Sequence, residues 1–328
     1  MRGRWSDGPV WLATTLILLC GCNPTTSPST VSARPPQNGG GLSCSLPVVT
    51  RLHAGFVDLP SLRFREDRSY PRDSAMGAFY AQGAHRWIRA QSTFGYLALS
   101  PDGTELVQFA PGSPGNIDVY LENLTNNKSR RVGSVANLLF LHPIGFVGDD
   151  LYLAGGYVYR LNVRTGNVDL LGPNAADASR ANQGLWFWAT SAGAWYSLIA
   201  GPNQGDRNSV YSLSPDGKMT TWYTAPTTRS VSIIGFVRPD EPLAVEYNTE
   251  PYEQMTGVVF RLLTAPGTSN RLTIDPSINA WGFTDSMGVW LSSPGHLWLY
   301  NANGLSPVGD LTHTAIGSDL PGVAGPCR

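Results

Sequence analysis

The sequence predicts an all-β protein, a β-propeller of six four-stranded blades, with seven blades as the alternative. Three observations lead to this prediction. Residues 45–328 contain no stretch that keeps apolar side chains at helical spacing for three turns. Short apolar runs bounded by Gly and Pro recur instead, as expected for strands. A Gly-Phe phrase also repeats with a period of about 45 residues or twice that, which is typical of propeller blades.

The Gly-Phe phrase sets the spacing of the predicted blades. It occurs at Gly55-Phe56-Val57, Gly145-Phe146-Val147, Gly235-Phe236-Val237 and, in a weaker form, Gly282-Phe283-Thr284. The first three copies are 90 residues apart. Half of that spacing predicts further blades, without the phrase, midway between the copies. Apolar strand pairs lie at both places, at 94–109 and 185–199. We interpret the phrase as the inner strand of a blade, where Gly permits close backbone approach and Phe fills the space between neighbouring blades.

The second half of each unit has the pattern of a hairpin, in which an apolar strand runs into a Gly turn and a more polar strand follows. The turns are Thr165-Gly166, Asp216-Gly217 and Asn303-Gly304. Gly adopts the positive φ that tight hairpins need, and Asp or Asn before it favours the turn. Residues 45–328 accommodate six units of about 45 residues, whereas seven blades would need units of about 40.

One hairpin resembles a known family. The stretch Leu99-Ser100-Pro101-Asp102-Gly103-Thr104-Glu105-Leu106-Val107 is similar to the Ser-Pro-Asp-Gly hairpin of bacterial TolB-like propellers. The resemblance covers this hairpin closely and the rest of the chain only through its period. It implies a six-bladed propeller domain over residues 44–328. It implies no particular activity, because one propeller scaffold serves many functions.

The first residues have the features of an export signal with a lipid attachment site. A short basic start precedes an apolar stretch, residues 10–19, that is too short to span a bilayer. Leu19-Cys20-Gly21-Cys22 then resembles a bacterial lipobox. This resemblance implies that the signal peptide, residues 1–21, is removed and that Cys22 is acylated as the first mature residue. An ordinary signal peptide that happens to contain two cysteines is the alternative.

Residues 22–43 form the predicted tether. They are rich in Pro, Ser, Thr and Gly, so they cannot bury enough apolar surface to offset the entropy of ordering. A flexible coil of this length has a root-mean-square span of about 25 Å. The sequence therefore predicts a domain held close to the extracytoplasmic side of a bacterial membrane.

Besides the acylated Cys22, two cysteines remain after processing, Cys44 at the start of the domain and Cys327 next to the end of the chain. Disulfides persist outside the cytoplasm and only one pairing is available, so we expect a Cys44–Cys327 bond. Two free thiols are the alternative. Because the bond would close nearly the whole domain into a loop, the chain-entropy model gives its contribution an upper limit of about 5 kcal/mol.

The sequence carries no signature of catalysis, of a cofactor or of a metal site. Its five histidines have no metal-ligand spacing, and the nearest approach to a nucleophile elbow, at 284–288, lacks the first Gly. Carboxylate pairs such as Asp149-Asp150 lie at turns, where a hairpin role is the simpler interpretation. We therefore predict no catalytic, cofactor-binding or metal-binding residues.

Aromatic side chains are abundant, and they are the one residue class whose abundance could indicate ligand binding. Trp186, Trp188 and Trp195 are candidate ligand-face residues, because alternation would place Trp186 and Trp188 on one face of a strand, with Trp195 on the partner strand. Packing between blades is the simpler explanation for most of the tryptophans. A polar insertion at 61–77, with four Arg and three acids, is a weaker pointer to an interaction face.

Charge and anchor together predict the class of function. A net charge of −1 with no long basic run disfavours a nucleic-acid partner. We expect a monomeric, lipid-anchored, extracytoplasmic module that binds or scaffolds without catalysis, and whose partner is an envelope protein, a peptide or a glycan. The alternative is a lyase or hydrolase acting on an extracellular polymer, with an active site gathered from several blades at the propeller axis.

Mass spectrometry of the membrane fraction tests the anchor. We expect the mature chain to begin at Cys22 and to carry its acyl chains there, because the lipobox resemblance places cleavage just before this residue. A soluble chain that starts elsewhere, with an unmodified Cys22, would contradict the prediction.

Overall fold

The computed structural model describes residues 42–70, 78–89, 98–136, 141–155, 157–172, 186–196, 208–248, 256–275, 277–279, 282–317 and 319–328. All 25 elements named within these ranges are β-strands, which confirms the all-β prediction. Cys22, the predicted signal peptide and all but the last two residues of the predicted tether lie outside them. In the same ranges, no helix has the length and apolar character needed to cross a membrane.

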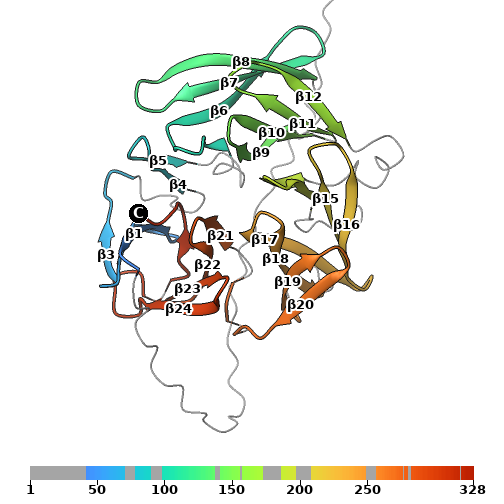
Figure 1. Ribbon diagram of the computed structural model, residues 1–328. Helices are drawn as coiled ribbons and strands as arrows, with labels where there is room; N and C mark the ends of the chain where they lie inside the picture. The colour runs from blue at the N-terminus through green and yellow to red at the C-terminus, as the bar shows by residue number, and fades with distance from the viewer. Residues whose placement is uncertain are drawn as a thin grey trace, which may run out of the picture.

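Within the described ranges the strands form seven antiparallel sheets, which we number in chain order (Figure 1). Sheet 1 consists of β25 (Gly322–Val323), β1 (Cys44–Val49), β2 (Ala54–Leu59) and β3 (Arg63–Glu66). Sheet 2 has only β4 (Ala78–Ala81) and β5 (Arg86–Arg89). Sheet 3 contains β6 (Glu105–Pro111), β7 (Asn116–Asn123) and β8 (Lys128–Ala136). An isolated bridge between Leu99 and Leu106 marks a further row of sheet 3.

Sheets 4 to 7 have four strands each, in chain order. Sheet 4 contains β9 (His142–Val147), β10 (Asp150–Ala154), β11 (Val158–Asn162) and β12 (Val168–Gly172). Sheet 5 contains β13 (Trp186–Thr190), β14 (Gly193–Tyr196), β15 (Ser209–Leu213) and β16 (Met219–Thr224). Sheet 6 contains β17 (Arg229–Arg238), β18 (Glu241–Asn248), β19 (Val259–Ala265) and β20 (Thr268–Leu272). Sheet 7 contains β21 (Gly282–Asp285), β22 (Gly288–Ser293), β23 (His296–Asn301) and β24 (Gly304–Asp310).

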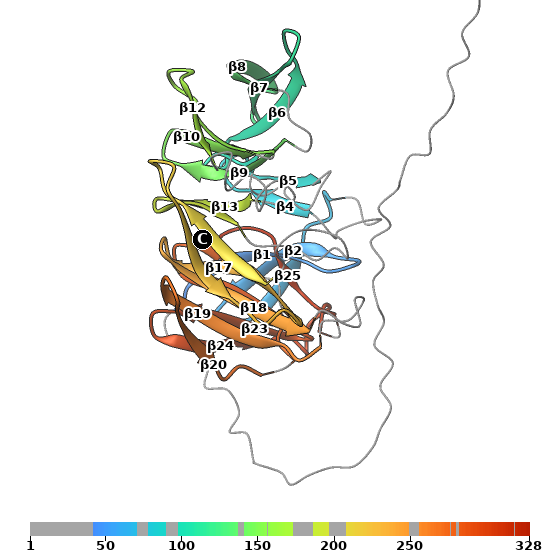
Figure 2. The ribbon, with the colours of Figure 1, turned by 90° about the vertical axis from the view of Figure 1, so that its right-hand side faces the viewer.

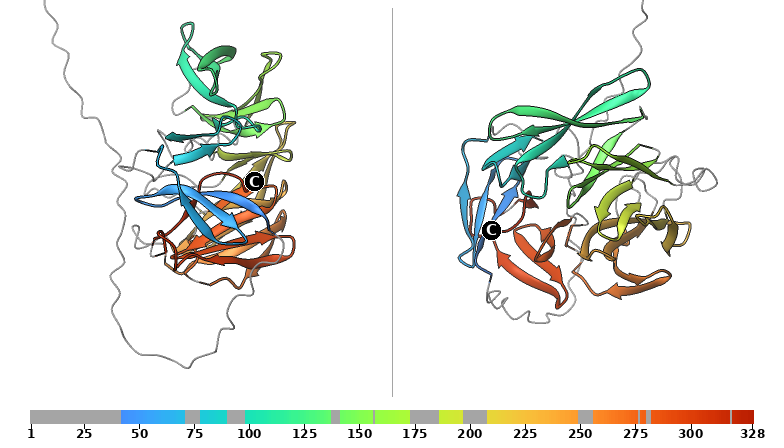
Figure 3. Two further views of the ribbon diagram at one scale, coloured as in Figure 1. Left: turned by 90° about the vertical axis from the view of Figure 1, so that its left-hand side faces the viewer. Right: turned by 45° about the horizontal axis from the view of Figure 1, so that its top comes forward.

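The sheets follow one another around a ring (Figures 1 and 3). β9 lies beside β13, and β17 lies beside β21, so the first strands of sheets 4 to 7 form their inner edges. Figure 2 shows the ring from its side, with sheet 3 at one end of the outline and sheets 6 and 7 toward the other. Four-stranded sheets arranged radially in this way form a β-propeller, as the sequence predicted.

The hydrophobic core lies between neighbouring sheets. In β10, Leu151 packs in a cluster with Val119 of sheet 3, and Tyr152 packs in a cluster with Tyr211 of sheet 5. Similar layers join sheets 5 and 6, 6 and 7, 7 and 1, and 1 and 2. Because successive side chains of a strand point to opposite faces, a strand buried on both faces has a continuous apolar sequence.

The prediction of six four-stranded blades is confirmed when the bridge at Leu99 is taken as the innermost row of sheet 3. Sheet 2 is an additional, two-stranded sheet that the 45-residue period did not reveal. Its strands have four residues each and carry no Gly-Phe phrase, so they fall unmarked into the interval between the copies at Gly55 and Gly145.

The Gly-Phe phrase marks an inner strand in three of its four copies, in β9, β17 and β21. A Cβ atom on Gly235 would stand 2.5 Å from Thr284 Oγ1, and one on Gly282 would stand 2.5 Å from the Ile234 carbonyl oxygen. Glycine is therefore required where sheets 6 and 7 meet. The assignment of Gly55 to an inner strand was wrong. This residue lies in β2, the third row of sheet 1, because the C-terminal strand β25 supplies the first row.

The C-terminal segment, residues 322–328, closes the ring at sheet 1. β25 pairs with β1, with Val48 opposite Val323. Cys44 and Cys327 form a disulfide, as the sequence predicted, with their Cα atoms 5.6 Å apart. The Ala324 N–H also donates a hydrogen bond to the Pro47 carbonyl at 2.9 Å.

The same segment joins the two sheets that flank sheet 1. The Cys327 N–H donates to Asp285 Oδ2 of sheet 7 at 3.0 Å. On the other side, the Tyr80 N–H of β4 donates to the Ala324 carbonyl at 2.7 Å, and the Gln82 side chain donates to the Pro326 carbonyl at 2.7 Å. Residues 322–328 therefore hold sheets 7, 1 and 2 together.

Replacement of both Cys44 and Cys327 by Ser should lower the free energy of unfolding. The disulfide links residues 283 apart, and loop closure of that length contributes up to about 5 kcal/mol. Urea denaturation of the oxidised wild type and of the double variant measures the difference. Equal midpoints, together with two free thiols in a non-reducing peptide map of the wild type, would contradict the prediction.

Candidate functional site

The three tryptophans predicted as a ligand face lie between sheets. Trp186 and Trp195 are fully buried, and Trp188 is half-buried. A β-bulge between Trp186 and Trp188 shifts the register of β13 against β14, so the two side chains enter different layers. Trp188 and Trp195 pack on Phe236 of sheet 6, with ring centroids 5.7 and 5.4 Å away, whereas Trp186 packs toward sheet 4. The expectation of Trp186 and Trp188 on one face was therefore wrong.

The described histidines are spread around the ring. His53 belongs to sheet 1, His85 to sheet 2, His142 to sheet 4, His296 to sheet 7 and His313 to the segment after it. Among the described residues, the shortest contact between a histidine and a carboxylate is the 3.0 Å between His53 Nδ1 and Glu66 Oε1. In the part of the chain that the structure describes, no group of three His, Cys, Asp or Glu side chains could hold a metal ion.

A buried carboxylate cluster joins sheets 5 and 6. Glu246 of β18 is only 3% exposed. Its Oε2 accepts hydrogen bonds from Tyr223 at 2.6 Å and from Arg261 at 2.5 Å, and its Oε1 pairs with Arg229. Sequence reasoning missed this cluster because its four members come from four different strands, and only the fold brings them together.

The Glu246 cluster is part of the core and is closed to ligands. Burial raises the pKa of Tyr223, and its hydrogen bond to Glu246 adds to that effect, so the pKa is about 12. Burial also opposes ionisation of Glu246. Hydrogen bonds from Tyr223 and Arg261, with the charges of Arg261 and Arg229, outweigh it and hold the pKa of Glu246 below its usual value. A paired and enclosed carboxylate of this kind is not available to a substrate.

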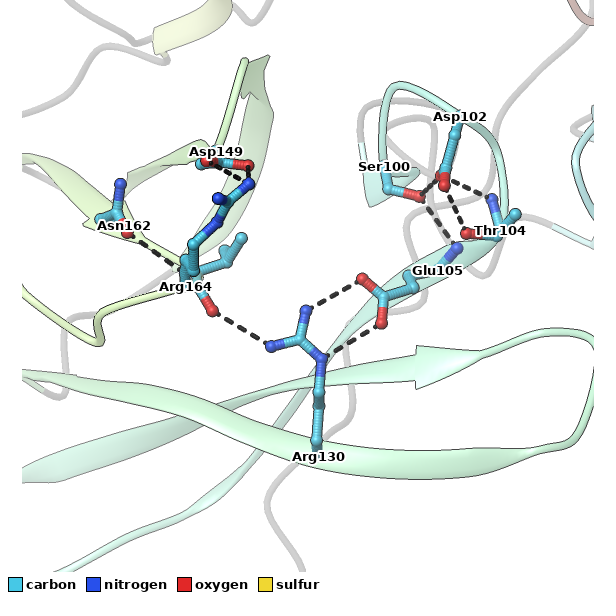
Figure 4. A network of polar contacts seen from close by, with 9 residues as sticks. Ser100, Asp102, Thr104, Glu105, Arg130, Asp149, Asn162 and Arg164 are labelled. Carbon is cyan, nitrogen blue, oxygen red and sulfur yellow. Dashed lines mark hydrogen bonds and ion pairs between the residues drawn. The ribbon is translucent and has the colours of Figure 1, made fainter.

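A polar surface open to solvent lies on sheets 3 and 4 (Figure 4). We call it the polar turn surface, and it consists of Ser100, Asp102, Thr104, Glu105, Arg130, Asp149, Asn162 and Arg164. At its first turn, Asp102 accepts hydrogen bonds from the Ser100 hydroxyl at 2.6 Å and from the Thr104 hydroxyl at 2.8 Å. This is the turn of the predicted Ser-Pro-Asp-Gly hairpin, and the carboxylate of Asp102 holds it closed.

An arginine in the polar turn surface connects sheet 3 to sheet 4. Arg130 of β8 donates to both carboxylate oxygens of Glu105, at 3.2 and 3.0 Å. Its remaining nitrogen donates to the Val163 carbonyl of sheet 4 at 3.1 Å (Figure 4). Beyond it, Arg164 pairs with Asp149 at 2.9 Å. Because Arg130 is held at three points, its charge has a fixed position between the two sheets.

An open cavity of about 370 Å³ adjoins the polar turn surface on sheet 4. Its lining consists of Asp150, Arg160, Asn162, Thr165, Asn167 and Asp169. Arg160 donates to Asp169 at 2.6 Å, and Asn162 Nδ2 donates to Asp150 at 2.8 Å. The hydrogen bond to Asp169 raises the pKa of Arg160, so this guanidinium stays charged. Asn162 belongs both to the cavity and to the polar turn surface.

This arrangement can act through hydrogen bonds and charge. Asn side chains offer donors and acceptors together, carboxylates accept, and a guanidinium donates from five N–H groups. Sequence reasoning treated Asp149-Asp150 as turn residues. The structure pairs Asp149 with Arg164 and Asp150 with Asn162, which places both carboxylates where the turn surface meets the cavity. The polar residues Arg160 and Asn162, alternating with apolar ones in β11, were the available signal.

Comparison with known proteins gives similarity to solved structures alone: no protein-family model matches the chain, and no curated protein sequence matches it. An oligogalacturonate lyase in complex with manganese is 13% identical at a TM-score of 0.41, over 79% of this chain and 70% of that one. TolB from Acinetobacter baumannii is 12% identical at a TM-score of 0.40, over 86% and 67%. The β-propeller domain of the Trilobed protease from Pyrococcus furiosus is 13% identical at a TM-score of 0.39, over 82% and 85%. At these values we assign neither an activity nor a site to this chain from them.

The contact between Tyr223 and Glu246 predicts a loss of stability at alkaline pH. Because folding raises the pKa of Tyr223 from 10.0 to about 12, its protonated phenol stabilises the fold fully below pH 10. That contribution is lost as the pH rises through 12. Tyr223→Phe cannot titrate, so its urea midpoint should fall less than that of the wild type between these pH values. Parallel curves for the two proteins would contradict the prediction.

Proposed function

We propose that the protein is a lipid-anchored, extracytoplasmic β-propeller that binds a polar partner without catalysis, at the polar turn surface and the adjoining cavity of sheet 4. The observation that carries this proposal is the fixed array of charges across sheets 3 and 4. Arg130 is held by Glu105, and Arg160 is held by Asp169 at the wall of the cavity.

A prearranged array favours binding because less side-chain freedom is lost when the partner arrives. The cavity wall alternates donors and acceptors, with the Arg160 guanidinium beside the carboxylates of Asp150 and Asp169. Such a wall suits a ligand that carries both kinds of group, which describes glycans and peptide backbones. Envelope glycans and exposed peptide segments of envelope proteins are therefore the partners that we propose.

The proposed anchor is compatible with this surface. The tether would enter the domain at Cys44 in sheet 1, and sheet 4 lies three places further round the ring. An acylated Cys22 with a flexible tether would keep the domain near the membrane while leaving sheets 3 and 4 accessible.

A glycan array, run beside pull-down from a crosslinked envelope, tests the proposal with two cavity variants. Arg160→Ala and Asp169→Ala should each weaken capture of the best ligand by about tenfold or more, because a hydrogen bond to a charged group contributes about 1.5–3 kcal/mol. Arg271→Ala is the matched control. This exposed arginine lies in β20 of sheet 6, away from the proposed surface, and its loss should leave binding unchanged.

Two results would contradict the proposal. One is equal capture by the wild type and both cavity variants. The other is turnover of a bound polymer by the wild type that disappears in His142→Ala, a residue of the inner strand β9.

A further inference from the structure

Sheet 2 has two strands where each of the other sheets has three or more. The inner side of β4 is occupied, because the Tyr80 N–H donates to the Ala324 carbonyl of the C-terminal segment. No strand in the described ranges pairs with the outer side of β5. Among the described strands, none therefore occupies the position beside β5 that a third strand takes in the other sheets; Figure 1 shows where β4 and β5 lie in the ring.

The hydrogen bond of Tyr80 also shows which backbone groups of β5 face that edge. Tyr80 of β4 lies opposite Trp87 of β5. Because the Tyr80 N–H points away from β5, toward Ala324, Tyr80 and Trp87 form a pair without hydrogen bonds between them. In an antiparallel ladder the N–H and C=O groups of Trp87 must then also point away from β4. The same holds two residues further on, at Arg89. Trp87 and Arg89 thus offer two donors and two acceptors at the outer edge.

The unpaired edge lies between sheets 1 and 3. On one side the Trp87 ring packs on Phe56 of sheet 1, with centroids 5.8 Å apart. On the other side the Arg86 guanidinium donates to the Leu124 carbonyl, at the end of sheet 3, at 2.9 Å. A strand added to β5 would therefore be covered on both faces, as a third strand is in a complete blade.

The faces of sheets 1 and 3 that turn toward this position carry polar side chains. In sheet 3, Val119 packs toward sheet 4, so its neighbour Asp118 faces the opposite way. Asp118 pairs with Arg131 at 2.8 Å, and the Arg131 side chain is 53% exposed. In sheet 1, Val57 packs toward sheet 7, and Asp58 on the opposite face pairs with Arg65 at 2.7 Å. Each of these two faces therefore carries an ion pair.

The chain segments that form sheets 1 and 2 carry an excess of positive charge. The described residues 42–70 and 78–89 contain six arginines and three acids. The arginines are Arg51, Arg63, Arg65, Arg68, Arg86 and Arg89. Two of these arginines are paired, Arg65 with Asp58 and Arg68 with Glu66, and Arg86 and Arg89 lie on β5 itself. The net excess of three positive charges in these two ranges contrasts with the net charge of −1 of the whole chain.

We propose that the outer edge of β5 is a docking site for an extended, acidic segment of a partner protein, which adds to sheet 2 as its third strand. Main-chain hydrogen bonds to Trp87 and Arg89 would supply the affinity, and the arginines would select acidic side chains. A second copy of this chain is disfavoured at the same edge, because Arg86 and Arg89 would meet their own counterparts. This site lies apart from the polar turn surface, so its failure would leave the proposed function untouched.

Fluorescence anisotropy with a labelled octapeptide of alternating Thr and Glu tests the docking site on the wild-type protein. The acidic peptide should bind, and the same peptide N-methylated at every residue should not bind, because it has no main-chain donors. An alternating Thr–Lys peptide should bind at least about fivefold more weakly, because its charges repel the arginines. Hydrogen exchange should slow at the amides of Trp87 and Arg89 when the acidic peptide is present.

Two variants at one position separate backbone pairing from charge. Arg89→Ala removes only charge and should weaken binding about threefold. Arg89→Pro also removes the outward N–H, which has no partner within the described sheet, and should weaken binding at least about fivefold further. The proposal fails if the acidic peptide does not bind, if the N-methylated peptide binds equally well, or if Pro and Ala have equal effects in folded protein. Binding to phosphatidylglycerol vesicles without binding to the peptide would identify a lipid surface instead and would also overturn it.

Discussion

The rest of the structure depends on the closure of the ring by residues 322–328. A propeller buries its apolar side chains between neighbouring sheets, so an open seam would expose the layers on both sides of it. Here the inner strand of sheet 1 is only the two-residue β25, and the Cys44–Cys327 disulfide lies beside it. The same seven residues donate to Asp285 of sheet 7 and accept from Tyr80 of sheet 2. Strand pairing, covalent linkage and contacts to both flanking sheets therefore act at one place.

Where the layers between sheets are complete, side chains have packing roles, and where they are incomplete, polar side chains remain available. Trp186 and Trp195 illustrate the first case, because each ring is buried in the apolar layer on one side of sheet 5. Glu246 illustrates the same rule for a charge, which is tolerated in the core only because two arginines and a tyrosine satisfy it. The edge of β5 belongs to the second case, and the polar turn surface lies at the turns of sheets 3 and 4, outside the apolar layer that joins them. They are the two places where we propose that a partner binds.

Much of the fold could be predicted from the sequence, because strand spacing and turn chemistry are local properties. Gly235 and Gly282 mark close approach between sheets, and Asp216-Gly217 and Asn303-Gly304 mark hairpins. Gly55 was wrongly assigned to an inner strand because the first strand of the chain, β1, is the second row of sheet 1. No local sequence pattern indicates this topology. The faces of Trp186 and Trp188 could not be predicted because a bulge interrupts their alternation. The pairing of Arg130 with Glu105 and its contact with sheet 4 depend on how two sheets meet, which only the folded chain determines.

Hydrogen–deuterium exchange of the oxidised protein and of the protein reduced by a dithiol tests the role of the C-terminal closure most directly. If residues 322–328 hold sheets 7, 1 and 2 together, reduction should accelerate exchange in β1, β4 and β21 at the same time. β10, β15 and β18 belong to sheets away from the seam and should remain protected. Exchange that increases only in the last residues of the chain, or that increases equally in every sheet, would contradict the account.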